Sequence, residues 1–148
     1  MPLYQAKRND NGQSVFGSSY TITAAAGTYA DTGFSITLPR SGTYLVYGNL
    51  RAALKISAGS IAWIATKLFN STDSADVSNT VRLIVLTEVL NAEVQSSMGF
   101  SHIMSVTASK VIKLYAKRDG TGTPTYTTSS IYSDSEGYSN LGYIWLAP

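Results

Sequence analysis

One stretch of alternating side chains, residues 43–54, constrains the fold of this chain more than any other. It follows a short apolar run at residues 34–38 and the break Pro39-Arg40-Ser41-Gly42. Pro39 fixes its own φ angle and has no backbone N–H, whereas Gly42 leaves the backbone free to turn. The break therefore predicts a turn, and the runs on either side of it predict a β-hairpin.

The two faces of the second arm differ, because successive side chains of a strand point to opposite faces. One face is apolar throughout and carries Tyr44, Val46, Gly48, Leu50, Ala52 and Leu54. The other face is mixed, yet it presents Leu45 and Tyr47 where a solvent-facing strand would favour Lys, Thr or Glu. We expect a second sheet, an overlying loop or a neighbouring subunit to cover it.

The rest of the chain predicts further strands. Apolar or alternating runs occupy residues 20–26, 61–69, 81–90, 95–107, 111–118 and 141–146. The run at 81–90 would also fit a helix, but its β-branched residues favour a strand. Residues 70–79 predict a surface loop, and the Thr-, Ser- and Tyr-rich residues 121–140 predict a long connection.

These strands predict one all-β domain. A chain of 148 residues can bury enough surface to fold without a metal or a disulfide. About eight short antiparallel strands with no helical period are typical of a sandwich or jelly roll. We expect an N-terminal arm over residues 1–19, with at most a short edge strand, and a single jelly-roll domain over residues 20–148.

The composition argues against several classes of protein. The chain has no cysteine, which excludes disulfides and thiolate metal sites. Its net charge is +2 and it has no basic stripe, so we expect neither a nucleic acid nor a membrane as partner. The first residues lack the apolar core of a signal peptide, which predicts synthesis in the cytoplasm.

The search for catalytic residues finds only isolated groups. His102 is the single histidine and has no recognisable nucleophile motif around it. Asp73 with Asp76, and Asp134 with Glu136, could bind calcium or form a glycosidase pair, but solvated loop acids are the simpler interpretation. We therefore expect no enzyme activity, no catalytic or metal-binding residue and no cofactor.

Three segments resemble a known family. They are FSITLPRSGTYLVYGNLRAAL, SVTASKVIKLYAKRDG and SNLGYIWLAP, and their markers are Gly42-Thr43-Tyr44, residues 111–118 and residues 143–146. Over residues 30–148 this pattern is similar to the C1q/TNF-like jelly-roll modules found in small virion proteins of tailed bacteriophages. The resemblance implies a homotrimer, with Leu45, Tyr47, Tyr143 and Trp145 as candidate contacts near the threefold axis.

The resemblance also implies a structural role in the virion. The first hypothesis is a head decoration or cement protein that binds between subunits of the major capsid protein. In that case the N-terminal arm, through Leu3, Tyr4, Val15 and Phe16, would contact the capsid. The alternative is a tail fibre or baseplate module that binds a host-surface glycan, with Tyr126, Tyr132 and Tyr138 stacking on sugar rings.

Overall fold

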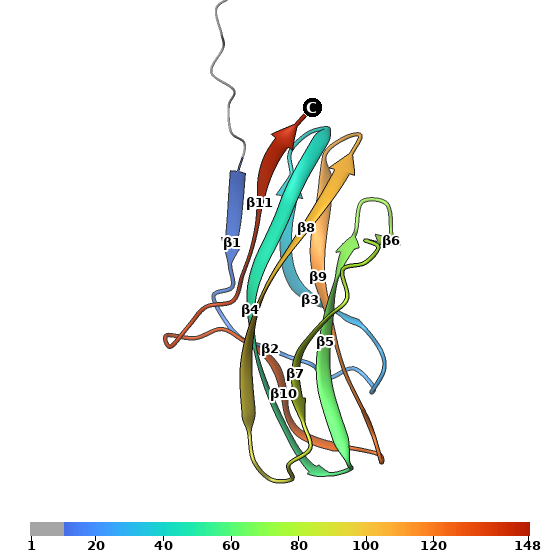
Figure 1. Ribbon diagram of the computed structural model, residues 1–148, viewed down its shortest axis with the longest axis vertical. Helices are drawn as coiled ribbons and strands as arrows, with labels where there is room; N and C mark the ends of the chain where they lie inside the picture. The colour runs from blue at the N-terminus through green and yellow to red at the C-terminus, as the bar shows by residue number, and fades with distance from the viewer. Residues whose placement is uncertain (1–10) are drawn as a thin grey trace, which may run out of the picture.

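The computed structural model describes residues 11–148, which form eleven strands and no helix (Figure 1). Every pairing between the strands is antiparallel, and the strands make two sheets. In sequence order the strands are β1 (Asn11–Val15), β2 (Tyr20–Thr21), β3 (Ala30–Leu38), β4 (Gly42–Ala58), β5 (Ile61–Asn70), β6 (Ala75–Asp76), β7 (Arg82–Thr87), β8 (Val94–Val106), β9 (Lys110–Thr121), β10 (Thr125–Tyr132) and β11 (Asn140–Ala147).

The first sheet, called sheet A here, is built around β4, which is 17 residues long. β8 pairs with one side of β4, from Gly42 opposite Val106 to Leu54 opposite Val94. Two strands share the other side: β11 pairs with the first part of β4 and β10 with the second part. β1 and β2 extend the sheet beyond β11 and β10, respectively (Figure 1).

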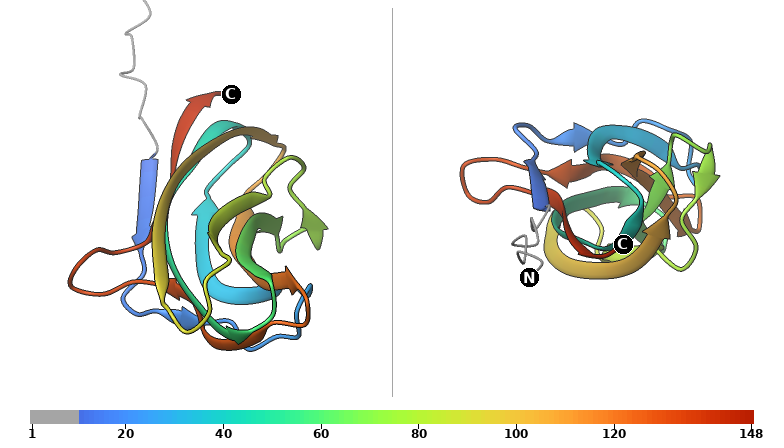
Figure 2. Two further views of the ribbon diagram at one scale, coloured as in Figure 1. Left: turned by 60° about the horizontal axis from the view of Figure 1, so that its bottom comes forward. Right: turned by 90° about the horizontal axis from the view of Figure 1, so that it is seen from above.

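The second sheet, sheet B, has the order β3-β9-β5-β6, with β7 also paired to β5. β9 lies between β3 and β5 and pairs with β5 along ten residues, from Thr121 opposite Ile61 to Ile112 opposite Asn70. The pairing of β7 with β5 has an irregularity between Ile64 and Ala65, since Ile64 is opposite Val85 and Ala65 is opposite Leu83. Seen from above, the curved strands of the two sheets enclose a common interior (Figure 2).

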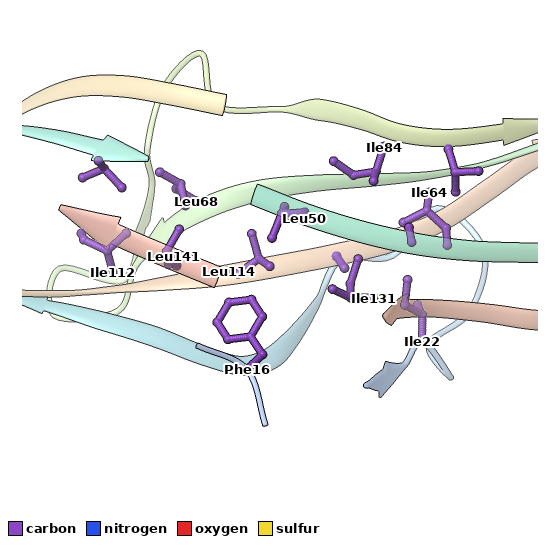
Figure 3. Packing of buried hydrophobic residues seen from close by; sticks show 14 of the residues in the cluster. Phe16, Ile22, Leu50, Ile64, Leu68, Ile84, Ile112, Leu114, Ile131 and Leu141 are labelled. Atoms are coloured by element: carbon purple, nitrogen blue, oxygen red, sulfur yellow. The ribbon is translucent and has the colours of Figure 1, made fainter. Parts of the chain in front are cut away.

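The core lies between the sheets and is formed by the faces that alternation predicts. All six apolar-face residues of β4 are buried: Tyr44, Val46, Gly48, Leu50, Ala52 and Leu54. Leu50 lies in the same buried cluster as Leu114 of β9, Ile64 of β5 and Leu141 of β11 (Figure 3). Each such side chain, once buried, contributes roughly 1.5–3 kcal/mol relative to its exposed state, so this face of β4 stabilises the sandwich substantially.

The strand order is that of a jelly roll, which confirms the predicted fold class. The first strand lies beside the last in sheet A, and β3, β4 and β5 alternate between the sheets. The predicted strands at 61–69, 95–107, 111–118 and 141–146 correspond to β5, β8, β9 and β11, and the ambiguous run at 81–90 contains strand β7.

Two expectations were wrong. Residues 121–140 do not form one long connection, because Thr125–Tyr132 is strand β10. The strand expected at 20–26 is limited to Tyr20–Thr21, since the chain then leaves sheet A. Arg118 on β9 holds the departing segment by donating from Nε to the Ala24 carbonyl at 3.1 Å.

Candidate functional site

The outer face of sheet A carries an apolar patch. Ile103 of β8, Leu45 of β4 and Ile144 of β11 lie opposite one another in the register and so form a row across three strands. Ile103 is 62% exposed and Ile144 is 38% exposed. We call the set Leu45, Tyr47, Ile103, Ile144 and Leu146 the sheet A patch.

Tyr47 lies flat against this face because its neighbour on β11 is a glycine. Tyr47 is opposite Gly142, and a Cβ on Gly142 would lie 2.5 Å from Tyr47 Cζ. Only glycine therefore lets the Tyr47 ring approach the backbone of β11 so closely. The other side chains beside the patch are small hydroxyls, such as Thr43 and Ser105, whose oxygens are 3.0 Å apart.

The described residues place no charged group on this part of the face. From Thr43 to Asn49 on β4, and from Gly99 to Ser105 on β8, the outward-pointing side chains are neutral. The first charge along β4 is Arg51, whose Nη1 donates to Asp134 Oδ1 at 2.8 Å and to the Gly137 carbonyl at 2.5 Å. The sheet A patch is thus apolar and uncharged.

Two residues predicted for the same surface lie on the opposite side of the sheet. Tyr143 is paired with Val46, and Trp145 with Tyr44, so both point to the interior. The Tyr143 ring meets the Tyr44 ring edge-on, with centroids 5.7 Å apart, and Arg40 covers the Trp145 ring at 4.2 Å. The expectation that Tyr143 and Trp145 share a surface with Leu45 and Tyr47 was therefore wrong.

The residues predicted for the capsid-binding arm do not share one environment. Leu3 and Tyr4 lie outside the described residues. Val15 is 55% exposed on β1, the edge strand beside β11, whereas Phe16 is 2% exposed and belongs to the core. Phe16 is thus not free to contact a capsid, which corrects that prediction.

The three tyrosines predicted for a glycan-binding loop do not form one surface. Tyr126 and Tyr132 are on strand β10, six residues apart, which corresponds to about 20 Å along a strand. Tyr132 lies under Arg51, and the Tyr126 hydroxyl is buried. Only Tyr138, 50% exposed, lies in the connection of β10 to β11 that projects from the sandwich (Figure 1).

The outer face of sheet B has a different character, because ion pairs cross it. Lys67 pairs with Asp76, Lys110 with Asp73, Lys113 with Asp31 and Lys117 with Asp119, at N–O distances of 2.5–3.0 Å. The hydrogen bond from Lys110 and that from Lys117 hold the pKa of Asp73 and of Asp119, respectively, below the usual value. Three of the acids predicted as possible calcium ligands are thus paired with protein cations, namely Asp73, Asp76 and Asp134.

No arrangement in residues 11–148 suggests a reaction centre. This region contains no group of three or more His, Asp or Glu side chains that could hold a metal ion, and no helix that could cross a membrane. His102 is on β8, and burial together with the charge of Arg82 lowers its pKa. A histidine in that environment is mainly neutral at pH 7.

A cleft opens at the end of the sandwich where β2 leaves β10. Its volume is about 390 Å³, and its lining consists of Thr21, Ile22, Thr23, Arg118, Tyr126, Thr127, Thr128, Ser129 and Ser130. Two irregularities interrupt the pairing of β10 with β4 around Tyr126, at this end of sheet A. The cleft is therefore lined mainly by hydroxyl groups around one guanidinium.

Sequence reasoning missed both Ile103 and Arg118, although each left a signal. Ile103 is the one large apolar residue in the outward series Gln95, Ser97, Gly99, Ser101, Ile103 and Ser105. Arg118 continues the inward series Ile112, Leu114 and Ala116, where a core residue would be expected. In each case one side chain differs in polarity from the other side chains on the same face of its strand.

Comparisons with known proteins support the fold. No protein-family model and no curated protein matches the sequence. Among solved structures, a chain from the structure of the Gx strain of infectious bursal disease virus is similar, with a TM-score of 0.54 and 14% sequence identity. The match covers 93% of this chain and 32% of the viral chain. The VP2 subviral particle of infectious bursal disease virus matches with a TM-score of 0.54 and 12% identity over 94% of this chain and 33% of that chain.

The chain spans about a third of the length of these viral chains. A mutant VP2 protein of the same virus, in derived T=1 particles, gives a similar result, with a TM-score of 0.53 and 13% identity over 94% of this chain and 32% of that chain. The jelly-roll sandwich described above is therefore of the type found in a viral capsid protein.

Proposed function

We propose that this protein is a structural component of a virion, and more specifically a bacteriophage head decoration protein of the C1q/TNF-like type that acts as a homotrimer. The single observation that carries the proposal is the sheet A patch, an uncharged apolar surface on a sandwich of viral-capsid type. In this proposal the protein is made in the host cytoplasm and stabilises the head by binding between subunits of the major capsid protein.

Self-association through sheet A is supported by its lack of charge. A homotypic interface brings identical groups near one another, so like charges there would repel. The outer face of sheet B carries four lysines and four aspartates in ion pairs, and burying them would cost desolvation free energy. The sheet A patch avoids both costs and leaves Leu45, Tyr47 and Ile103 at the proposed interface.

The capsid would be contacted by the N-terminal residues and by β1. Leu3 and Tyr4 precede β1, and Val15 exposes an apolar side chain at the edge of sheet A. Binding to the assembled head but not to free subunits stabilises the head by mass action. The decoration protein would then raise the temperature at which the head dissociates.

The trimer is tested by measuring solution mass with light scattering after size exclusion. We expect a trimer for the natural sequence and a monomer for Ile103→Asp, because the substitution places three carboxylates in an apolar contact. The matched control is Leu83→Asp, since Leu83 is exposed on β7 of sheet B and is 46% accessible. A monomeric natural protein, or a trimer that survives Ile103→Asp, would overturn the proposed interface.

The capsid contact is tested by cosedimentation with heads prepared without this protein. Deletion of residues 1–10 stops before β1 and so keeps every described strand. We expect this deletion, combined with Val15→Asp, to weaken binding to heads while the trimer persists. Undiminished sedimentation with heads would contradict the proposed contact between the N-terminal residues and the head.

A further inference from the structure

The cleft at the end of the sandwich holds a cation without a carboxylate partner. Arg118 points inward from β9, and the described residues place no carboxylate within 4 Å of its guanidinium. By contrast, Arg51 and the lysines of sheet B are each paired with an aspartate. The half-buried positive charge of Arg118 is therefore available to an anion.

The hydrogen bonds of Arg118 leave part of its donor capacity unused. Nε donates to the Ala24 carbonyl at 3.1 Å, Nη1 to Ser129 Oγ at 3.1 Å and Nη2 to the Thr23 carbonyl at 3.4 Å. A guanidinium has five N–H donors, so one N–H remains on each of Nη1 and Nη2. Free N–H donors of a guanidinium can bind the oxygens of a carboxylate.

Tyr126 helps to hold this guanidinium in the cleft. Its ring lies under the guanidinium of Arg118, 4.7 Å from Cζ to the ring centroid. A cation over an aromatic ring is attracted by the ring, so Tyr126 orients Arg118. The Tyr126 hydroxyl makes no hydrogen bond to the described residues, but it is buried, so a molecule in the cleft would not contact it.

The remaining walls determine what kind of anion would fit. Thr21, Thr23 and Thr128 present hydroxyls that can donate or accept, and Arg118 is the only cation in the lining. One cation favours a single negative charge, whereas a doubly charged phosphate group would leave charge uncompensated. The volume of about 390 Å³ is within the range of small-molecule sites.

We propose that this cleft binds a sugar that carries one carboxylate, with the carboxylate on Arg118 and a ring hydroxyl on Thr21. The threonine and serine hydroxyls would bind the remaining hydroxyls of the sugar. This inference does not depend on the virion proposal, because the cleft lies in one chain and away from the sheet A patch. Either proposal can therefore fail without the other.

The test is titration of the natural protein with glucuronate, followed by amide chemical shifts and by calorimetry. Glucose and inorganic phosphate serve as comparison ligands, since glucose lacks the carboxylate and phosphate lacks the sugar ring. We expect glucuronate to shift the amides of Thr21, Thr23 and Thr128 and to bind about tenfold or more tightly than glucose or phosphate. Absence of these shifts, or tighter binding of phosphate, would overturn the proposal.

Two variants assign the contacts. Arg118→Lys keeps one charge but loses the paired donors, and we expect it to weaken glucuronate binding by about tenfold or more. Thr21→Val removes one hydroxyl of the lining at an exposed position, so it should weaken binding without lowering the melting temperature. That second variant keeps the test decisive if Arg118→Lys unfolds the β2–β3 segment.

The control is Arg82→Lys, because Arg82, like Arg118, makes no ion pair with the described residues. It donates to the backbone carbonyls of Asn79 and Val81 and lies outside the cleft. This control should bind glucuronate like the natural protein. Equal binding by all three variants would show that the sugar does not contact Arg118 or Thr21, and the proposed site would be wrong.

Discussion

The ring of Phe16 stacks on the ring of Phe34, with centroids 3.6 Å apart and planes 7° from parallel. Phe16 directly follows β1, and Phe34 lies on β3 of the other sheet. The contact therefore joins the edge of sheet A to sheet B. It makes Phe16 a core residue, although the four residues before it are half-buried or exposed.

Phe16→Ala should lower the free energy of unfolding by about 3–5 kcal/mol, because it removes a fully buried ring and leaves a cavity. The measurement is urea denaturation followed by tryptophan fluorescence. Val15→Ala is the matched control, since Val15 is the adjacent residue and points outward. Comparable losses from the two substitutions would contradict the assignment of Phe16 to the core.

Ser133→Ala should cost about 1–3 kcal/mol, because it leaves buried polar groups without partners. The Ser133 hydroxyl donates to the Phe16 carbonyl and accepts from the Ser139 amide at 3.1 Å, so it connects three segments of the chain. Ser135→Ala, two residues away and exposed, should change stability by less than about 0.5 kcal/mol. Thermal unfolding of both variants distinguishes the outcomes, and equal melting temperatures would refute the role of the Ser133 hydroxyl.

Gly120→Ala should destabilise the protein by about 1–3 kcal/mol, since the added methyl would overlap backbone atoms. A Cβ at this position of β9 would lie 2.3 Å from the Ile61 carbonyl oxygen and 3.1 Å from Ala62 Cα. At Gly99, on β8, the nearest atom would be 3.9 Å away, so Gly99→Ala should be tolerated or slightly stabilising. Chemical denaturation of the two variants measures the difference, and no difference would show that β9 relaxes freely there.

Acid should destabilise the protein partly through Asp31. Burial alone would raise the pKa of Asp31, but hydrogen bonds from Lys113 and from the Gly33 amide together hold it below the usual value. A pKa that is lower in the folded state gives stability that is present above the unfolded value, about pH 3.9, and is lost as the pH falls through the folded value.

Asp31→Asn should therefore lower the melting temperature at pH 7 and have progressively less effect as the pH falls below about 4. The measurement is the melting temperature of both proteins across the acidic range. Curves that stay parallel at all pH values would mean that the Lys113–Asp31 pair does not contribute to acid unfolding.

Alternation along β4 predicted the inner face correctly because it is a local property. Which residues of β11 share a face with Leu45 is instead decided by register, and a shift of one residue moves every side chain to the other face. Tyr143 pairs with Val46, so it points inward, and nothing in either segment specified that pairing. The prediction of a shared surface failed for this reason.

The polar composition of residues 125–132 concealed β10 for a related reason. Its Ser129 and Ser130 are buried, and Ser129 Oγ donates to the Ile22 carbonyl at 3.0 Å. Hydroxyl side chains can enter an interior when backbone groups from a distant segment accept their hydrogen bonds. Such partners are visible only once the fold is known, and the same is true of the cleft at Arg118.

The position of β4 in sheet A has a consequence for how the chain folds. The three strands that pair with β4, namely β8, β10 and β11, come after residue 93, and Asn11 of β1 pairs with Ile144. During synthesis β4 would leave the ribosome with both edges unpaired, and unpaired edges associate readily with other chains. Contacts this distant in sequence also make folding slow. The sheet can close only when β11 has been synthesised, so this sandwich folds late and needs protection from aggregation until then.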